Sequence, residues 1–151
     1  MILFLNSTLR AQKIELKKER LKTVGVQMSL ERINGRKSVK VLKDSTVKEF
    51  DEPTYVKITD LNFENGIIEV DVLSRLLPGA PEMARGFIGL AFHINGDNSK
   101  FEGIYLRPTN ARAANQLRRN RSVQYFAFPD FKFEESRKTA PGGYESYVDL
   151  E

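Results

Sequence analysis

The segment 100-KFEGIYLRPTNARAANQLRRNR-121 combines a clear strand pattern with the most basic loop of the chain. Two sets of residues alternate along its first half, which is the period of a β-strand with two different faces. One set is Phe101, Gly103, Tyr105 and Arg107, and the other is Glu102, Ile104 and Leu106. Pro108 ends the strand, and residues 107–121 then contain five arginines and no carboxylate. We therefore expect a sheet face that presents Tyr105 and Arg107 beside an arginine-rich loop, which together form a candidate binding surface.

The strand period recurs along most of the chain. Apolar residues alternate on both sides of Asn34-Gly35, a dipeptide typical of tight hairpins, and this predicts a β-hairpin over 23–43. Further strands are predicted at 55–58, 67–73, 86–94, 123–128 and 144–150, with Ile68, Val70 and Val72 facing the core. Residues 13–22 fit a short exposed helix or an edge strand, and 111–117 fit one or two helical turns. Short strands separated by turns indicate an antiparallel sandwich or barrel, so the fold class is all-β.

The composition restricts the class of protein. The chain has 151 residues, the size of one domain, with 40% hydrophobic and 29% charged residues, as in ordinary globular proteins. The absence of cysteine excludes disulfides and thiolate metal sites, and the single histidine, His93, excludes a multi-histidine metal centre. The net charge of +4 is too small to indicate nucleic-acid binding. No apolar run reaches the ~18 residues of a membrane span.

The N-terminus allows two interpretations. Residues 1–5 (MILFL) are apolar, and Ala11-Gln12 resembles a cleavage site before the charged residues that follow. Residues 1–12 are therefore either a signal-peptide remnant, in a protein that is secreted or periplasmic, or a short disordered or strand-forming tail.

Several segments together resemble a known superfamily. They are FENGIIEVDV (63–72), RGFIGLAFH (85–93), FEGIYLRP (101–108), SVQYFAF (122–128) and YESYVDL (144–150). This series resembles secreted bacterial members of the concanavalin A-like lectin/glucanase superfamily, which are related to laminin-G-like domains. The resemblance implies a two-sheet antiparallel jelly-roll sandwich over 13–151 with a concave face suited to carbohydrate.

The resemblance also implies that the domain is incomplete. Relatives continue after an acidic turn such as 149–151 with a tryptophan-led strand, whereas this chain has no tryptophan. A sheet that stopped there would leave an unpaired edge, which natural proteins protect. We therefore expect the jelly roll to be truncated at its C-terminal end.

Glu69 and Asp71 are the candidate catalytic residues. Carboxylates at i and i+2 of a strand share a face with Cα atoms ~6.7 Å apart, which suits the ~5–5.5 Å separation of a retaining glycosidase. Glucanases of the superfamily resembled here carry a third acid on that strand, but Val72, Leu73 and Ser74 follow Asp71. The incomplete motif favours two solvated carboxylates over an enzyme.

The candidate ligand-binding residues favour a carbohydrate-binding module. Aromatic rings stack on sugars, and an arginine fork binds carboxylate or sulfate, so Tyr105 and Arg107 suit an anionic glycan such as an acidic polysaccharide. Packing between strands is the structural alternative for this pair. His93, expected on the face of Phe87, Gly89 and Ala91, is a candidate sugar contact. Either Gln124 or Tyr125 can join the Tyr105 face. The loop residues Arg112, Arg118, Arg119 and Arg121 would overhang it or form a solvated surface.

No metal or cofactor is implied by a clear motif. Asp97 and Asp130 are the carboxylates considered for calcium, but no dense loop of oxygen ligands surrounds them. The leading prediction is thus a non-catalytic lectin-like module. A glycan-active enzyme would need a third carboxylate near Glu69 and Asp71. A laminin-G-like protein-interaction module would have a flat sheet without convergent polar groups.

Overall fold

The computed structural model describes residues 12–49 and 52–150. The chain is mostly β, with small antiparallel sheets and a few short helices, which confirms the predicted antiparallel β class. It divides into two compact units, Met1–Asn62 and Phe63–Glu151, and each is described by itself. Residues 1–11, which carry most of the predicted signal-peptide remnant, lie outside the described residues. In the part of the chain that is described, no helix has the length and apolar character needed to cross a bilayer.

The first unit contains the predicted hairpin. Strands β2 (Val26–Ile33) and β3 (Arg36–Lys43) pair along their full lengths. Asn34 and Gly35 connect them with φ angles of 50° and 76°, the left-handed pair that a tight type I′ turn requires. Strand β1 (Leu21–Val24) pairs with β4 (Tyr55–Ile58), which confirms the strand predicted at 55–58. The segment predicted as a helix or an edge strand forms a 3₁₀ turn, Lys18–Arg20, and then enters β1.

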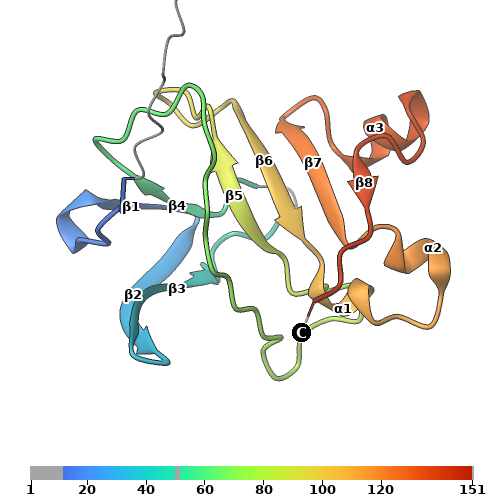
Figure 1. Cartoon of the computed structure of the whole chain (residues 1–151), viewed down its shortest axis with the longest axis horizontal. Coiled ribbons are helices and arrows are strands. Elements are labelled where there is room, and N and C mark those ends of the chain that lie inside the picture. Colours follow the sequence, from blue (N-terminus) through green and yellow to red (C-terminus); the bar gives the residue numbers. More distant parts are fainter. Residues whose placement is uncertain (1–11, 50–51, 151) are drawn as a thin grey trace, which may run out of the picture. The chain divides into compact units, whose positions relative to one another are not determined.

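The second unit is built on a four-stranded antiparallel sheet in the order β5-β6-β7-β8 (Figure 1). The strands are β5 (Ile88–Phe92), β6 (Phe101–Leu106), β7 (Val123–Phe128) and β8 (Glu145–Ser146). The predicted strand at 123–128 is confirmed to the residue, and β5 and β6 confirm the two strands before it. Each strand pairs with the next strand along the chain, and antiparallel neighbours need no crossover connection.

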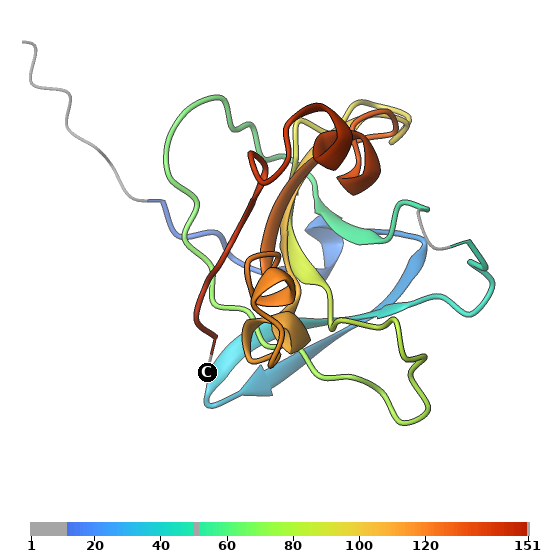
Figure 2. The same cartoon turned by 90° about the vertical axis from the view of Figure 1, so that its right-hand side faces the viewer.

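Helices lie at both ends of this sheet (Figures 1 and 2). Helices α1 (Pro108–Ala111) and α2 (Gln116–Arg119) occupy the connection from β6 to β7, so the arginine-rich segment is partly helical. The Asn115 side chain caps α2 by accepting a hydrogen bond from the Arg118 N–H. Helix α3 (Phe133–Thr139) follows β7 and was not predicted. It places Arg137 near the sheet, and this residue becomes important below.

Close packing inside the sheet explains one glycine. The Phe126 ring on β7 lies over Gly103 of β6, where an added Cβ would stand 2.4 Å from a ring carbon. Phe126 also makes edge contacts with Tyr105 and Phe101, at centroid distances of 5.4 and 5.7 Å. The missing side chain of Gly103 therefore makes room for an aromatic layer on the Tyr105 face.

The predicted strand at 67–73 is wrong. These residues are irregular, and Ile68, Val70 and Val72, predicted to face the core, are 40–51% exposed. Among the described residues no strand pairs with this segment. An alternating pattern specifies which face is apolar, but the strand itself exists only through hydrogen bonds to a neighbour.

The last predicted strand is much shorter than expected. Of residues 144–150 only Glu145–Ser146 pairs with β7. Beyond it the Val148 N–H donates to the Ser122 hydroxyl at 2.9 Å and not to a backbone carbonyl of the sheet. A side chain thus ends the ladder by satisfying the next backbone donor.

Candidate functional site

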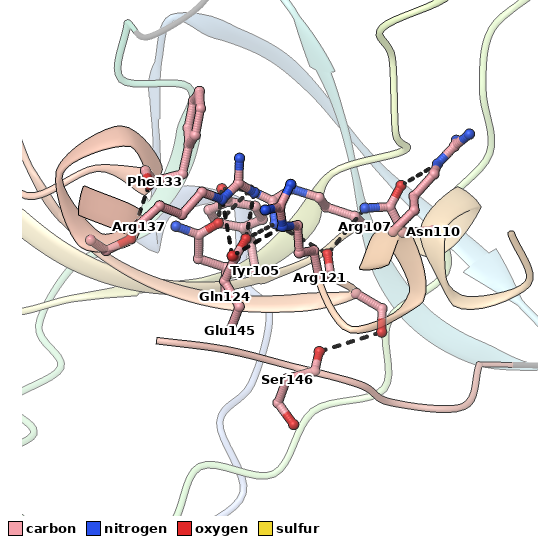
Figure 3. A network of polar contacts seen from close by, with 12 residues as sticks. Tyr105, Arg107, Asn110, Arg121, Gln124, Phe133, Arg137, Glu145 and Ser146 are labelled. Carbon is pink, nitrogen blue, oxygen red and sulfur yellow. Dashed lines mark hydrogen bonds and ion pairs between the residues drawn. The ribbon is translucent and has the colours of Figure 1, made fainter. Parts of the chain in front are cut away.

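A row of polar side chains crosses three strands of the second unit. Tyr105 on β6 is opposite Gln124 on β7, and Gln124 is opposite Glu145 on β8. Opposed residues in an antiparallel sheet point to the same face, so the three side chains are neighbours. Arg107 extends from the end of β6 onto this row, and the whole network is shown in Figure 3. The strand register therefore builds the site.

Arg107 lies at the centre of the network and is 6% exposed. Its Nη2 donates to the Tyr105 hydroxyl at 2.6 Å and to Gln124 Oε1. Its Nη1 donates to the Arg121 carbonyl at 3.1 Å and to Glu145 Oε1 at 3.2 Å. Burial lowers the pKa of Arg107, because it penalises the charged form. The surrounding acceptors stabilise the charge, and they hold the guanidinium in place across the sheet.

Glu145 is the only carboxylate that the described residues bring to the network, and its side chain is 4% exposed. The planar guanidinium of Arg137, on α3, donates two hydrogen bonds to this carboxylate. Its Nε lies 3.0 Å from Oε2 and its Nη2 lies 2.5 Å from Oε1. Arg107 Nη1 contacts Oε1, and Arg121 Nε lies 3.5 Å from Oε2. Burial alone would raise the pKa of Glu145, but the Arg137 hydrogen bonds and the charges of the three arginines lower it overall.

The network has two unbalanced features. Three guanidinium groups surround one carboxylate, which leaves two positive charges in excess. Gln124 is 1% exposed, and its Nε2 is buried without a hydrogen-bond partner although Oε1 has two. A buried donor without an acceptor costs free energy. Both features are those of a site that accepts an anionic or carbonyl oxygen.

The structure brings together three of the candidate binding residues. Tyr105, Arg107 and Gln124 lie in one network, and of the two β7 candidates it is Gln124 that shares their face. Arg107 is buried and not exposed on an open surface.

Most of the loop arginines have structural partners elsewhere. Arg118 donates to the side chain of buried Asn110 at 2.9 Å, and Arg119 donates to the carbonyls of Ala113 and Ala114. Arg112 lies at the surface, where it donates to the Leu150 carbonyl. Arg121 alone of the four reaches the Glu145 network. The predicted overhanging cluster is therefore divided between contacts within the helical segment, the surface and the site.

The predicted placement of His93 is wrong. His93 has a φ of 51°, which interrupts the strand alternation after β5. Its Nδ1 lies 2.6 Å from Glu102 Oε1, and Tyr125 donates to Glu102 Oε2 at 2.6 Å. Glu102 and Tyr125 belong to the face of the sheet opposite Tyr105. His93 is thus part of a second polar cluster on the other face.

The carboxylates considered for catalysis and for calcium are all exposed. Glu69 and Asp71 are exposed and lie on an irregular segment, so the shared strand face expected for them is absent. The Asp97 carboxylate accepts from the Ser99 N–H and hydroxyl within its own turn, and Asp130 is exposed. Within residues 12–49 and 52–150 no group of three or more His, Cys, Asp or Glu side chains is arranged to hold a metal ion.

Glu145 and Arg137 are site residues that sequence reasoning missed. Arg137 lies on α3, whose seven residues contain no long apolar stripe that would have indicated a helix. Glu145 had a usable signal, because a carboxylate inside a predicted strand needs a cationic partner when that strand is buried.

Comparison with protein-family models, curated proteins and solved structures gives no match for this chain.

Proposed function

We propose that this protein is a non-catalytic carbohydrate-binding module that uses the Tyr105 face of the four-stranded sheet. The observation that supports this proposal is the convergence of polar side chains from β6, β7, β8 and α3 beside the exposed Phe87 ring. The proposal extends to a concanavalin A-like jelly roll in a secreted protein, as the resemblance of the sequence implies.

An aromatic surface accompanies the polar network. Phe87, which immediately precedes β5, is 58% exposed and contacts the edge of the Tyr105 ring at a centroid distance of 5.5 Å. The Arg107 guanidinium lies 4.8 Å from the Tyr105 ring centroid and orients that ring. A sugar combines apolar C–H faces with hydroxyls. A site for one sugar ring therefore needs an exposed aromatic ring with hydrogen-bonding groups close to it. Phe87 and the network supply both.

Two alternatives are less well supported. A glycan-active enzyme was expected to use Glu69 and Asp71, whose exposed, irregular segment supplies no fixed carboxylate pair. A laminin-G-like interaction module was expected to show a flat sheet without convergent polar groups, whereas Arg107, Gln124 and Glu145 converge here. The geometry therefore favours a binding module over these two alternatives.

The test is glycan-array binding by the full chain, beside Phe87→Ala and Leu117→Ala. These two side chains are matched, because both are apolar, lie in the same unit and are 58% and 59% exposed. Loss of one stacking contact weakens binding by about tenfold, so we expect Phe87→Ala to lose affinity while Leu117→Ala keeps it. The absence of binding to any glycan by the unmodified protein would contradict the proposal.

A further inference from the structure

We propose that the arginine network recognises the carboxylate of an acidic sugar, so that the ligand is a uronic acid residue. This inference rests on the proposed function and assigns the chemical class of the ligand to defined donors. The donors are Arg121 and Arg137, which contact the Glu145 carboxylate, and Gln124, which is opposite Glu145 in the sheet.

The exposed arginines retain unused donors. The side chains of Arg121 and Arg137 are 33% and 28% exposed, whereas that of Arg107 is 7% exposed. Arg137 donates to Glu145 through Nε and Nη2, and Arg121 Nε lies 3.5 Å from Glu145 Oε2. Each guanidinium carries five N–H donors in one plane. The remaining N–H groups of these two residues are available to a second anion at the surface of the network.

The charge of the network favours that second anion. Three arginines and one glutamate carry two net positive charges, and the partial burial of the group reduces screening by water. Burial already lowers the pKa of Arg107, an indication that the enclosed positive charge is costly. A bound carboxylate would neutralise one of the excess charges.

Gln124 supplies an independent observation. Its Oε1 accepts from Tyr105 and Arg107, so the amide orientation is determined and Nε2 must point the other way. Nε2 is buried and has no acceptor among the described residues. In Figure 3 the Gln124 side chain lies beside Glu145 and Arg137, within the same cluster. A ligand that enters beside Arg137 would deliver the acceptor oxygen that this donor lacks.

The donor set matches a carboxylate better than a hydroxyl. Guanidinium forks and an amide N–H only donate, so the group that satisfies them must accept hydrogen bonds with two oxygens and carry negative charge. A sugar hydroxyl would bring a further donor into a site that already has donors in excess. The planar carboxylate of a uronic acid fits the planar forks, and the sugar ring would then reach the neighbouring aromatic surface.

The experiment uses the full chain and calorimetric titration with three probes: methyl glucuronide, methyl glucoside and inorganic sulfate. The first two probes differ only in the carboxylate, which replaces a hydroxymethyl group. One charge-assisted bidentate contact changes affinity by about tenfold or more, so we expect the glucuronide to bind at least that much more tightly than the glucoside.

The variants locate the contact. Gln124→Glu keeps Oε1 for Arg107 and Tyr105 but replaces the Nε2 donor with a negatively charged oxygen, so we expect it to abolish glucuronide binding while the circular dichroism spectrum is unchanged. Arg121→Ala removes a partly exposed side chain and should weaken binding about tenfold if one charged contact is lost. Arg121→Ala still tests the contact if Gln124→Glu, at a buried position, disturbs folding. Arg112→Ala, which removes an arginine outside the network, should leave binding unchanged.

Each of the following results would overturn the inference. Equal affinities for glucuronide and glucoside, or loss of binding with Arg112→Ala but not with Arg121→Ala, would remove the carboxylate assignment and leave carbohydrate binding intact. Sulfate that binds as tightly as the glucuronide would show an anion site with no preference for a sugar. Failure of every saccharide, on the array and in titration, would overturn both the inference and the proposed function.

Discussion

Two polar clusters occupy opposite faces of the same sheet and have the same plan. In each, one glutamate accepts hydrogen bonds from partners on other segments: Glu145 from arginines on the Tyr105 face, and Glu102 from His93 and Tyr125 on the other. The two clusters differ in how far their glutamates are exposed to water. The Glu145 side chain is 4% exposed and the Glu102 side chain is 34% exposed. Burial strengthens electrostatic interactions and makes a lost partner costly, so the two clusters should contribute very differently to stability.

The largest expected effect is that of Glu145→Ala. It would leave three clustered arginines without their carboxylate, and breaking a buried ion pair costs about 3–5 kcal/mol of the free energy of unfolding. Urea denaturation followed by circular dichroism measures the change. Asp149→Ala is the control, because its ion pair with Arg112, at 3.8 Å, is exposed on both sides. Equal midpoints for the two variants would mean that the Glu145 network is not a structural centre of this unit.

Acid should weaken the Glu145 cluster selectively. The folded-state pKa of Glu145 lies below its ordinary value of 4.5, so its stabilising contribution is present above that value and is lost as the pH falls through the lowered pKa. In Glu145→Gln this part of the pH dependence should disappear. Thermal unfolding at several pH values between about 6 and 3 measures it. Parallel stability curves for the variant and the unmodified chain would show that Glu145 does not titrate as described.

On the face that carries Glu102, a substitution should mainly change the pKa of Tyr125. The hydrogen bond to Glu102, together with burial, raises the pKa of Tyr125 to about 12. A raised tyrosine pKa stabilises the fold fully below the ordinary value of 10.0, and this contribution is lost as the pH rises towards about 12.

Glu102→Gln should therefore move the Tyr125 transition back towards 10.0 in a titration of tyrosinate absorbance, with Tyr125→Phe identifying that transition. The accompanying loss of stability should stay below about 1 kcal/mol, as for other exposed pairs. A loss as large as that of Glu145→Ala would remove the distinction between the two faces.

The sequence predicted most of the strands, including β4, whose partner β1 lies far earlier in the chain. The hairpin at Asn34-Gly35 and the strands β5, β6 and β7 were recognisable, because alternation and turn residues act over a few positions. Residues 67–73 carry an equally good alternation but form no strand, since pairing depends on a partner that local pattern does not reveal. Local pattern thus locates candidate strands and leaves their partners open.

The candidate site was predictable only in part, for the same reason. Alternation placed Tyr105 and Arg107 together, and it correctly allowed Gln124 to join them. Glu145 and Arg137 come from segments 38 and 30 residues after Arg107 and enter the network through β8 pairing and an unpredicted helix. His93 was misplaced because one left-handed residue reverses the expected face. Burial of Arg107 could not be read from the loop composition.

The irregular segment at 67–73 has a consequence for solubility. Ile67 is 88% exposed and Val70 is 51% exposed, within a stretch whose apolar and β-branched residues are of the type that forms cross-β contacts between copies. Glu69 and Asp71 place two like charges inside that stretch, where they act as gatekeepers against stacking of identical segments. We expect Glu69→Gln, Asp71→Asn to aggregate faster than the unmodified chain by light scattering, and an unchanged rate would remove that role. Faster aggregation of the double variant would mean that the two carboxylates act through repulsion between molecules.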